Sequence, residues 1–589
     1  MITPAASSGP AEARHQNVAD SPASDERRVQ FPDHEATAAG LIRDAANRWE
    51  DRILVILDDQ RVTYREVEQQ SAEMARALLT SGVTRGTRLG LLAPNGPDWV
   101  VAWLAATRIG AVTTLLSTYL RPRELSWALG HSGVEVLVTA DGYLGRRYPE
   151  DLETAIPDLA FQRRGGIEIA SHPDLAKVYV WNGTDRGWTS TVEDLLVDAS
   201  GTTNTDLVIA EAAVGPDDPM LVMYTSGSTA EPKGVIHGHG GVVRHPYNLL
   251  PFRDLVPGDV LYTPMPLFWV GGLTYTLVSA MHAGATVVFE ERFEAGATLD
   301  LIEAEKVTHV VGWPHMSQAL TEHPSFPTRD LSAVRGGSLD ALLPPDLRVG
   351  DPELRANSLG MTESLGPHSI ELFGSALPEA KRGSFGRAVP GIEHRFVDPS
   401  TGEGVLEGEL GEIWIRGYPL MLGLVGTPNH AVFMPDGWYR TGDVGHLDAD
   451  GHLYFKGRMG DQIKTSGMNV MPREVELVIE EQPEVMHAFV AGVTHTKRGQ
   501  DVAAAVVLRP GMSVDSEEVL ERLRGDLSSY KVPRHVAIYD SPEDLPWLES
   551  GKIDLRGLSG CWPNATPPNL LRLEEGQEAA RQRSFVAPR

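Results

Sequence analysis

The chain has 589 residues, of which 42% are hydrophobic and 22% charged, and its formal net charge at pH 7 is −28. This length exceeds what one hydrophobic core usually serves, so the sequence predicts two or more domains. The negative charge argues against nucleic acid or an anionic membrane as a general partner, although local basic pockets for phosphate stay compatible with it.

A single cysteine, Cys561, leaves no partner for an intrachain disulfide and no cysteine-based zinc site. No apolar run reaches the roughly 18 residues of a membrane span. Residues 1–28 lack the apolar stretch of a secretory signal. We therefore expect a cytoplasmic protein whose residues 1–32, rich in Ala, Ser, Pro and charge, form a disordered tail.

From residue 33 onward, apolar strands and helices alternate along the chain. The patterns predict paired strands at 52–59 and 61–67, a helix over 67–82, a buried strand at 88–95, a helix and then a strand within 98–116, and further strands at 134–141, 259–266, 284–291 and 307–314. This alternation is typical of an α/β protein with largely parallel sheets.

After residue 400 the sequence pattern changes to short β segments separated by glycine turns. A smaller α+β unit begins near 472 and ends near 551–558. The predicted fold class is α/β, with a large N-terminal domain of mostly parallel sheets and helices, a small β subdomain, and a smaller mobile α+β C-terminal domain. The expected boundaries are 1–32 for the N-terminal tail, 33–460 for the large domain, 461–560 for the C-terminal domain and 561–589 for a C-terminal tail.

The stretch MYTSGSTAEPKGVIHGH, residues 223–239, is unusually rich in small hydroxyl and glycine residues. It is either an idle surface loop or a cradle of N–H and O–H donors for phosphate, with one lysine as the cation. The order differs from a Walker A loop. The candidate donors are Thr225, Ser226, Gly227, Ser228, Thr229 and Lys233. The histidines that follow, His237 and His239, are expected to be structural.

Within this stretch, YTSGSTAEPKG resembles the signature loop of the adenylate-forming superfamily, which includes acyl-CoA synthetases, peptide adenylation domains and firefly luciferase. Ala230 stands where that family usually has glycine. Companion motifs follow in the family's order: SLGMTES at 358–364, GWYRTGDVG at 437–445, FKGRMGDQIKTSGMNVMPREVE at 455–476 and LPWLESGKIDL at 545–555. The resemblance covers roughly residues 33–560.

The resemblance implies ATP and Mg²⁺ as ligands of these motifs. Glu363 would hold Mg²⁺ and Thr362 would donate to the α-phosphate, while Lys552 would be the catalytic cation. The remaining residues of the implied nucleotide site are Gly336, Gly337, Leu359, Gly360, Met361, Asp443 and Arg458. Leu359 replaces the family's usual aromatic residue at the adenine, and Asp443 and Arg458 match the ribose contacts.

Family members rotate the small domain between two half-reactions. The resemblance places the hinge at Asp461, and it places Lys464, Ser466 and Gly467 at the tunnel through which a thiol such as that of coenzyme A would enter.

The segment PLFWVGGL, residues 266–273, matches the family's acyl-pocket segment and contains no charge, which argues against an α-amino acid as substrate. Apolar and small residues predict a pocket for an aryl or aliphatic acid: Trp269, Gly271, Gly272, Trp313, Gly336, Gly337 and Met361. His315 and His368 could meet a polar substituent. For Trp313, packing in the core is an equally good interpretation.

The leading functional hypothesis is an AMP-forming acyl-CoA synthetase that uses ATP, Mg²⁺ and coenzyme A. An alternative is an adenylation enzyme that passes the acyl group to a carrier-protein phosphopantetheine or another nucleophile. A non-catalytic nucleotide-binding relative is the alternative of another class, and retention of Lys552, Glu363, Asp443 and Arg458 speaks against it. The acid, the acceptor and the oligomeric state stay open.

Overall fold

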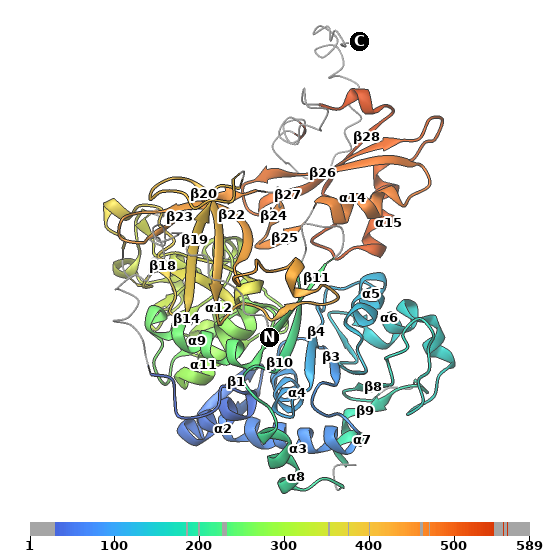
Figure 1. Cartoon of the computed structure of the whole chain (residues 1–589), viewed down its shortest axis with the longest axis vertical. Coiled ribbons are helices and arrows are strands. Elements are labelled where there is room, and N and C mark those ends of the chain that lie inside the picture. Colours follow the sequence, from blue (N-terminus) through green and yellow to red (C-terminus); the bar gives the residue numbers. More distant parts are fainter. Residues whose placement is uncertain are drawn as a thin grey trace, which may run out of the picture.

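The computed structural model describes residues 30–183, 186–197, 201–225, 232–351, 354–374, 376–399, 401–459, 463–470, 472–546, 558 and 562. A large domain carries most of the chain, and a smaller C-terminal domain, orange to red in Figure 1, lies against one end of it. This arrangement confirms the predicted fold class.

One sheet of the large domain contains the strands that lead into the candidate phosphate loop. Its strand order is β21-β11-β10-β4-β3-β5-β8-β9, where β10 to β9 run parallel and β11 and β21 are antiparallel additions. Their bounds are β3 Arg88–Leu92, β4 Val112–Leu115, β5 Val136–Thr139, β8 Lys177–Val180, β9 Ser190–Thr191, β10 Pro219–Thr225, β11 Lys233–Gly238 and β21 Gly423–Leu424.

A second sheet of the large domain runs in the order β15-β14-β12-β13-β1-β2, parallel except for β2. Its strands are β1 Ile53–Leu57, β2 Gln60–Thr63, β12 Val260–Tyr262, β13 Thr286–Phe289, β14 His309–Val310 and β15 Gly336–Gly337. The short ribbon of β6 Gly142–Tyr143 and β7 Arg146–Arg147 lies outside both sheets.

The helix predicted over 67–82 is α3, and it begins three residues earlier than predicted, because residues 64–66, predicted as the end of a strand, form its first turn. Helix α3 starts after a capping box of Thr63 and Glu66 and ends before Gly82, which has φ +91°. The helix bounds are α2 Ala38–Trp49, α3 Tyr64–Thr80, α4 Pro97–Arg108, α5 Pro122–Ser132, α6 Tyr148–Ala155, α7 Val192–Val197, α8 Asn204–Ala212, α9 His239–Arg253, α10 Val270–Gly272, a π-helical turn η3 Leu273–Val278, α11 Ser279–Ala283, α12 Ala295–Ala304 and α13 Pro314–Glu322.

Helix α4 is the centre of the main hydrophobic core, because its residues from Trp99 to Arg108 are all buried. The buried guanidinium of Arg108 is paired with Glu211 at 2.5 Å and Glu68 at 2.9 Å, which compensates its charge. Phe31, assigned from sequence to the N-terminal tail, already packs edge-to-face against Tyr247.

The small β subdomain consists of two antiparallel sheets that carry the later motifs. One has the order β16-β17-β18 and the other β19-β20-β22-β23. The bounds are β16 Ser358–Met361, the 3-10 turn η8 Thr362–Ser364, β17 Gly366–Ile370, β18 Arg387–Ala388, β19 Ile392–Val397, β20 Gly411–Gly417, β22 Tyr439–Leu447 and β23 Leu453–Arg458.

The C-terminal domain is an α+β unit built on a sheet of order β25-β24-β27-β26, with β28 paired to β27. One face of the sheet packs against the helices, and the other face forms a separate apolar cluster. The bounds are β24 Ile463–Thr465, β25 Met468–Val470, α14 Pro472–Glu480, β26 Val485–His495, β27 Gly499–Leu508, α15 Ser516–Asp526 and β28 His535–Tyr539.

Several histidines are buried in the large domain and the β subdomain. Burial lowers the pKa of His237 and His282 to about 3, and the pKa of His239, His245 and His394 to about 4. These side chains are therefore neutral in the folded protein at pH 7.

We predict that acid weakens the fold through these histidines. In the unfolded chain each histidine has a pKa near 6.5 and binds a proton that the folded state excludes. Their full contribution is present above about pH 6.5 and is lost as the pH falls toward the folded values, by up to about 1.4 kcal/mol per pH unit for each group. Urea midpoints at about pH 7.5 and about pH 5.5 would measure the loss.

The replacement of His282 by Gln should reduce the change of the urea midpoint with pH, because it removes one group whose pKa differs between the folded and unfolded states. The matched control is His430→Gln at an exposed position, which should leave the slope unchanged. Equal urea midpoints at both pH values in the unmodified protein would contradict the prediction.

Candidate active site

The candidate phosphate loop joins the ends of a β-hairpin. Strands β10 and β11 pair in antiparallel register, and the last backbone pair before the loop is Thr225 with Lys233. The apolar residues 221–223 lie in β10, which runs directly into the loop. The predicted donors of the loop itself, Ser226, Gly227, Ser228 and Thr229, and the neighbouring Ala230 lie outside the described residues.

The carboxylate and the backbone around Glu363 are held by Tyr439 and His237, which belong to two other motifs, and by Met421. Tyr439 on β22 donates its hydroxyl to Oε1 of Glu363 at 3.2 Å, and the N–H of Met421 donates to the carbonyl of Glu363 at 2.8 Å. Nε2 of His237 lies 2.8 Å from the carbonyl of Thr362, where its N–H donates. His237, directly beyond the phosphate loop, therefore supports Thr362, as a structural residue does.

The strand before Glu363 requires a glycine. A Cβ at Gly360 would lie 2.4 Å from the backbone of Gly366, so the two strands of this hairpin approach too closely for any side chain there. The neighbours Leu359 and Met361 are partly buried against the apolar cluster of the β subdomain. Leu359, the predicted adenine contact, thus also packs within that subdomain.

Asp443 and Arg458, the predicted ribose contacts, are direct backbone partners across β22 and β23. Asp443 is buried, and its N–H donates to Oγ1 of Thr441 at 3.0 Å. Tyr439 lies on the same strand as Asp443, so β22 links the candidate metal ligand with the candidate ribose ligand.

An aromatic cluster lies where the two domains meet. The rings of Trp269 and Trp313 cross at 80° with their centroids 6.2 Å apart. The ring centroid of Tyr119 lies 6.1 Å from that of Trp269 and 6.4 Å from that of Tyr530 in the C-terminal domain. A Cβ at Gly467 would lie 2.1 Å from Cδ1 of Trp313, so the backbone of the loop at Gly467 lies in direct contact with the indole ring. Trp313 therefore lies at the contact between the two domains.

The other residues of the predicted thiol tunnel flank Gly467. Ser466, with φ +50°, donates its N–H to the carbonyl of Arg498 at 2.8 Å. Lys464 is exposed, and its Nζ lies 5.5 Å from the centre of the Phe455 ring. The predicted hinge Asp461 lies outside the described residues.

The surroundings of several predicted acid-pocket residues are described. A Cβ at Gly271 would meet Sδ of Met265 at 2.6 Å, and one at Gly272 would meet the Pro266 carbonyl at 2.2 Å. These glycines let the helix start close to the preceding turn. His368 is fully buried, with Nδ1 2.9 Å from Nε2 of His394. The side chain of His315 is not among the described ones.

The glycine pair on β15 is required by a close backbone approach. Gly337 has φ +117°, and a Cβ there would lie 2.1 Å from the carbonyl oxygen of Val310. A Cβ at Gly336 would meet the ring of His309 at 2.5 Å. Any side chain at these positions would separate β15 from β14.

The domain contact is anchored by a buried lysine. Lys531 of the C-terminal domain, 5% exposed, lies 3.1 Å from Glu124 on α5 and 3.2 Å from Glu474 on α14. Ser528 donates to the other oxygen of Glu124 at 2.7 Å. Burial alone would lower the pKa of Lys531, but Tyr530, Glu474 and Glu124 raise it above its ordinary value. The ammonium therefore stays charged.

The candidate catalytic Lys552 lies outside the described residues, but residues on both sides of it are described. Leu545 and Leu558 are buried in one apolar cluster on the sheet face opposite α14 and α15. Trp562 packs in the same cluster, so the packed domain extends beyond Gly560 into the segment that the sequence assigned to the tail.

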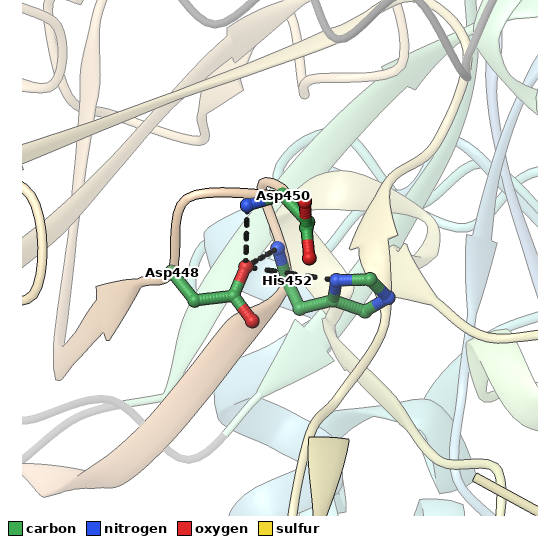
Figure 2. Close-up of side chains that lie close together, drawn as sticks. All are labelled: Asp448, Asp450 and His452. Carbon is green, nitrogen blue, oxygen red and sulfur yellow. Dashed lines mark hydrogen bonds and ion pairs between the residues drawn. The ribbon is translucent and has the colours of Figure 1, made fainter. Parts of the chain in front are cut away.

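Figure 2 shows Asp448, Asp450 and His452, which lie close together in the turn between β22 and β23. Lys381 donates to Asp448 at 2.8 Å and also to Asp450. Burial would raise the pKa of Asp448, but Lys381 and the N–H of His452 lower it to about 2. A lysine ammonium supplies the positive charge here, so the cluster stabilises a turn.

Comparison with known proteins identifies the family. Residues 42–425 match the AMP-binding enzyme family, and residues 474–552 match the AMP-binding enzyme C-terminal domain. The chain belongs to the AMP-binding enzyme family. This confirms the predicted membership of the adenylate-forming superfamily.

Relatives of this AMP-binding enzyme include acyl-CoA synthetases. A feruloyl-CoA synthase of an Amycolatopsis species is 34% identical over 500 residues, which cover 84% of this chain and 92% of the relative. An indoleacetate–CoA ligase of Aromatoleum aromaticum is 30% identical over 504 residues, with 84% and 92% covered.

Among solved structures, an amide bond synthetase from Marinactinospora thermotolerans is 27% identical with a TM-score of 0.73, covering 89% of this chain and 99% of that one. No helix among the described residues of the AMP-binding enzyme is long and apolar enough to cross a membrane.

Sequence reasoning missed the residues that connect the motifs. Tyr439 stands inside the quoted motif GWYRTGDVG, so its place next to Asp443 was a usable signal. Tyr119, Glu124 and Lys531 lie outside the recognised motifs, and no sequence pattern links α5 to the C-terminal domain.

We predict that Glu124→Gln loosens the C-terminal domain. The change leaves the Lys531 ammonium with one carboxylate in a buried place, and breaking such a buried pair typically costs about 3–5 kcal/mol unless the groups regain water. Undocking returns Lys531 to water, so limited proteolysis between the domains should become faster.

The matched control is Glu407→Gln at an exposed position, which should leave the proteolysis rate unchanged. Unchanged proteolysis of the Glu124→Gln variant would contradict a role of this ion pair in docking.

Proposed function

We propose that this AMP-binding enzyme activates a carboxylic acid with ATP and then transfers the acyl group to the thiol of coenzyme A. The observation that carries the proposal is the contact of the Gly467 backbone with Trp313, which joins the predicted thiol loop to the predicted acid pocket. Relatives named as CoA ligases support the same reaction class.

In the first half-reaction, a carboxylate oxygen attacks the α-phosphorus of ATP and the bond to the bridging oxygen breaks, releasing pyrophosphate. The residues of the β10–β11 hairpin would hold the phosphates, and Lys552 would neutralise the charge that grows on the α-phosphate. The buried Glu363 carboxylate suits Mg²⁺, which would neutralise phosphate charge when bound. Tyr439 keeps that carboxylate in place.

In the second half-reaction, the thiolate of coenzyme A attacks the acyl carbonyl and AMP leaves. The described arrangement suits this step, because the Gly467 loop lies on Trp313, whereas Leu545 and Leu558 on either side of Lys552 pack on the far face of the C-terminal sheet. Adenylation would then require rotation of the C-terminal domain to bring Lys552 to the nucleotide.

A second candidate acceptor is an amine, because the amide bond synthetase of M. thermotolerans shares this fold over nearly its whole length. A carrier-protein thiol is a third acceptor with the same first half-reaction.

To separate these acceptors, AMP and pyrophosphate release is measured over a panel of aryl and aliphatic acids, alone and with coenzyme A, a carrier protein bearing phosphopantetheine, or simple amines. AMP release without thioester formation would sink the CoA proposal, and absence of ATP cleavage with every acid would sink the first step.

We expect Lys552→Ala to block adenylate formation by about 10²–10³-fold while it spares thioester formation from a supplied acyl-adenylate. The control Lys306→Ala, at an exposed lysine of the large domain, should affect neither step. Equal loss in both half-reactions would remove Lys552 from its proposed role.

Gly467→Leu should have the opposite effect, because a side chain there collides with Trp313 in the docked arrangement only. Thioester formation should fall while ATP–pyrophosphate exchange persists. The matched control is Gly511→Leu, since Gly511 has the same φ of +80° as Gly467 but no atom within 4 Å of the place that a Cβ would take. Unaltered thioester formation by Gly467→Leu would count against the proposed tunnel.

A further inference from the structure

A cavity of about 50 Å³ lies beside the predicted acid pocket. Its lining includes Gly336 and Gly337 of that pocket, Tyr275 on the helical segment that follows Gly272, and Val311 shortly before Trp313. One water needs about 10–15 Å³ of such space, so a carboxylate-sized group fits. The cavity therefore continues the wall of the predicted acid pocket.

Arg253, the last residue of α9, lines this cavity and is 5% exposed. Its guanidinium carbon lies 3.6 Å from the centre of the Tyr275 ring, and Nη1 donates to the Tyr275 carbonyl. In the described part of the chain, Arg253 makes no ion pair with a carboxylate. Burial lowers the pKa of its guanidinium, although an arginine stays charged in proteins.

The nearby acidic groups are occupied by a second arginine. Arg335 donates to Asp254 at 3.0 Å and to Asp259 at 2.6 Å. His309 completes this side of the cavity, and burial lowers its pKa to about 4, so it carries no charge at pH 7. The two aspartates balance the two arginines in number, but both are bonded to Arg335, and among the described residues Arg253 has only the carbonyl and the ring of Tyr275 as direct partners.

A buried charge without a partner is costly, and such a charge is normally paired or binds an anion. We infer that Arg253 binds a second anionic group of the substrate, so that the activated acid is an aryl or aliphatic dicarboxylic acid. The inference rests on the proposed function and specifies its substrate class.

The two ends of such a substrate would be held differently. The reacting carboxylate would lie near Trp313 and the Gly467 loop, and the chain or ring would pass Gly337 to the cavity. A guanidinium has five N–H donors. Because the Tyr275 ring covers one of its faces and the Tyr275 carbonyl accepts from Nη1, the distal carboxylate would approach along the guanidinium edge.

The test compares each dicarboxylic acid with its own monomethyl ester, which keeps the chain or ring between the two carbonyl groups, removes one charge and adds one methyl group. Straight-chain acids from succinic to sebacic acid and terephthalic acid form the panel, and kcat/KM of pyrophosphate release is measured. We expect at least one diacid to exceed its ester by about tenfold to hundredfold, the effect of one charge-assisted hydrogen bond.

In Arg253→Gln this ratio should fall toward one, because the carboxylate and the ester then meet the same neutral amide. The control Arg61→Gln, at an exposed arginine paired with Glu305, should keep the ratio of the unmodified enzyme. The ratio compares two acids on one enzyme, so a partial loss of folded protein cancels.

Esters or simple monocarboxylic acids used as well as every diacid would overturn the inference while leaving the proposed function intact. A ratio that survives in Arg253→Gln would overturn it too. If that variant does not fold, the panel on the unmodified enzyme decides alone. ATP cleavage with no acid of any kind would instead refute the proposed function itself.

Discussion

The contact of Lys531 with two carboxylates, one from each domain, is the constraint on which the observed arrangement depends. Three charges share a site that water barely reaches, and the attraction offsets their desolvation only when the geometry is good. Glu124 has additional support from Ser528 and from its place in the first turn of α5. Because these bonds require α5 and α14 to be adjacent, they select one docking of the C-terminal domain.

That docking determines which loop reaches the candidate site. With Lys531 on Glu124, Tyr530 lies against Tyr119, and Gly467 lies on Trp313. A glycine is needed at 467 because the left-handed backbone and the indole leave no room for a Cβ. The ion pair of Lys531 with Glu124 and the packing of Gly467 on Trp313 therefore both stabilise this position of the C-terminal domain.

The sequence predicted much of the fold because the relevant signals are local. The strand pair that begins near residue 52 and the helix that ends before Gly82 each follow from residues within a few positions of one another, although the second strand ends at Thr63 and the helix begins at Tyr64, earlier than predicted. The motifs assigned Asp443 and Arg458 to the same ligand, and the structure pairs their backbones across neighbouring strands. Such short-range patterns are where propensity and periodicity are most informative.

What the sequence could not predict involves partners far apart in the chain. Lys531 and Glu124 are separated by 407 positions, and neither stands in a recognised motif. The sequence assigned Gly271 and Gly272 to the acid pocket but did not show that their missing side chains also make room for the turn at Met265 and Pro266. A glycine in the sequence does not reveal which neighbouring atoms require its missing side chain. The burial of Trp562 likewise depends on a sheet face formed by distant strands.

Leu545 and Leu558, which flank the segment that carries Lys552, pack in one apolar cluster. An extended chain advances by at most about 3.6 Å per residue, so an anchor six positions away limits the Cα of Lys552 to a radius of roughly 20 Å around Leu558. A displacement of Lys552 by more than that radius therefore requires movement of the C-terminal domain as a rigid body. If Lys552 acts at the nucleotide as proposed, the whole C-terminal domain has to bring it there, so residues at the base of that domain affect adenylation without touching any reacting atom.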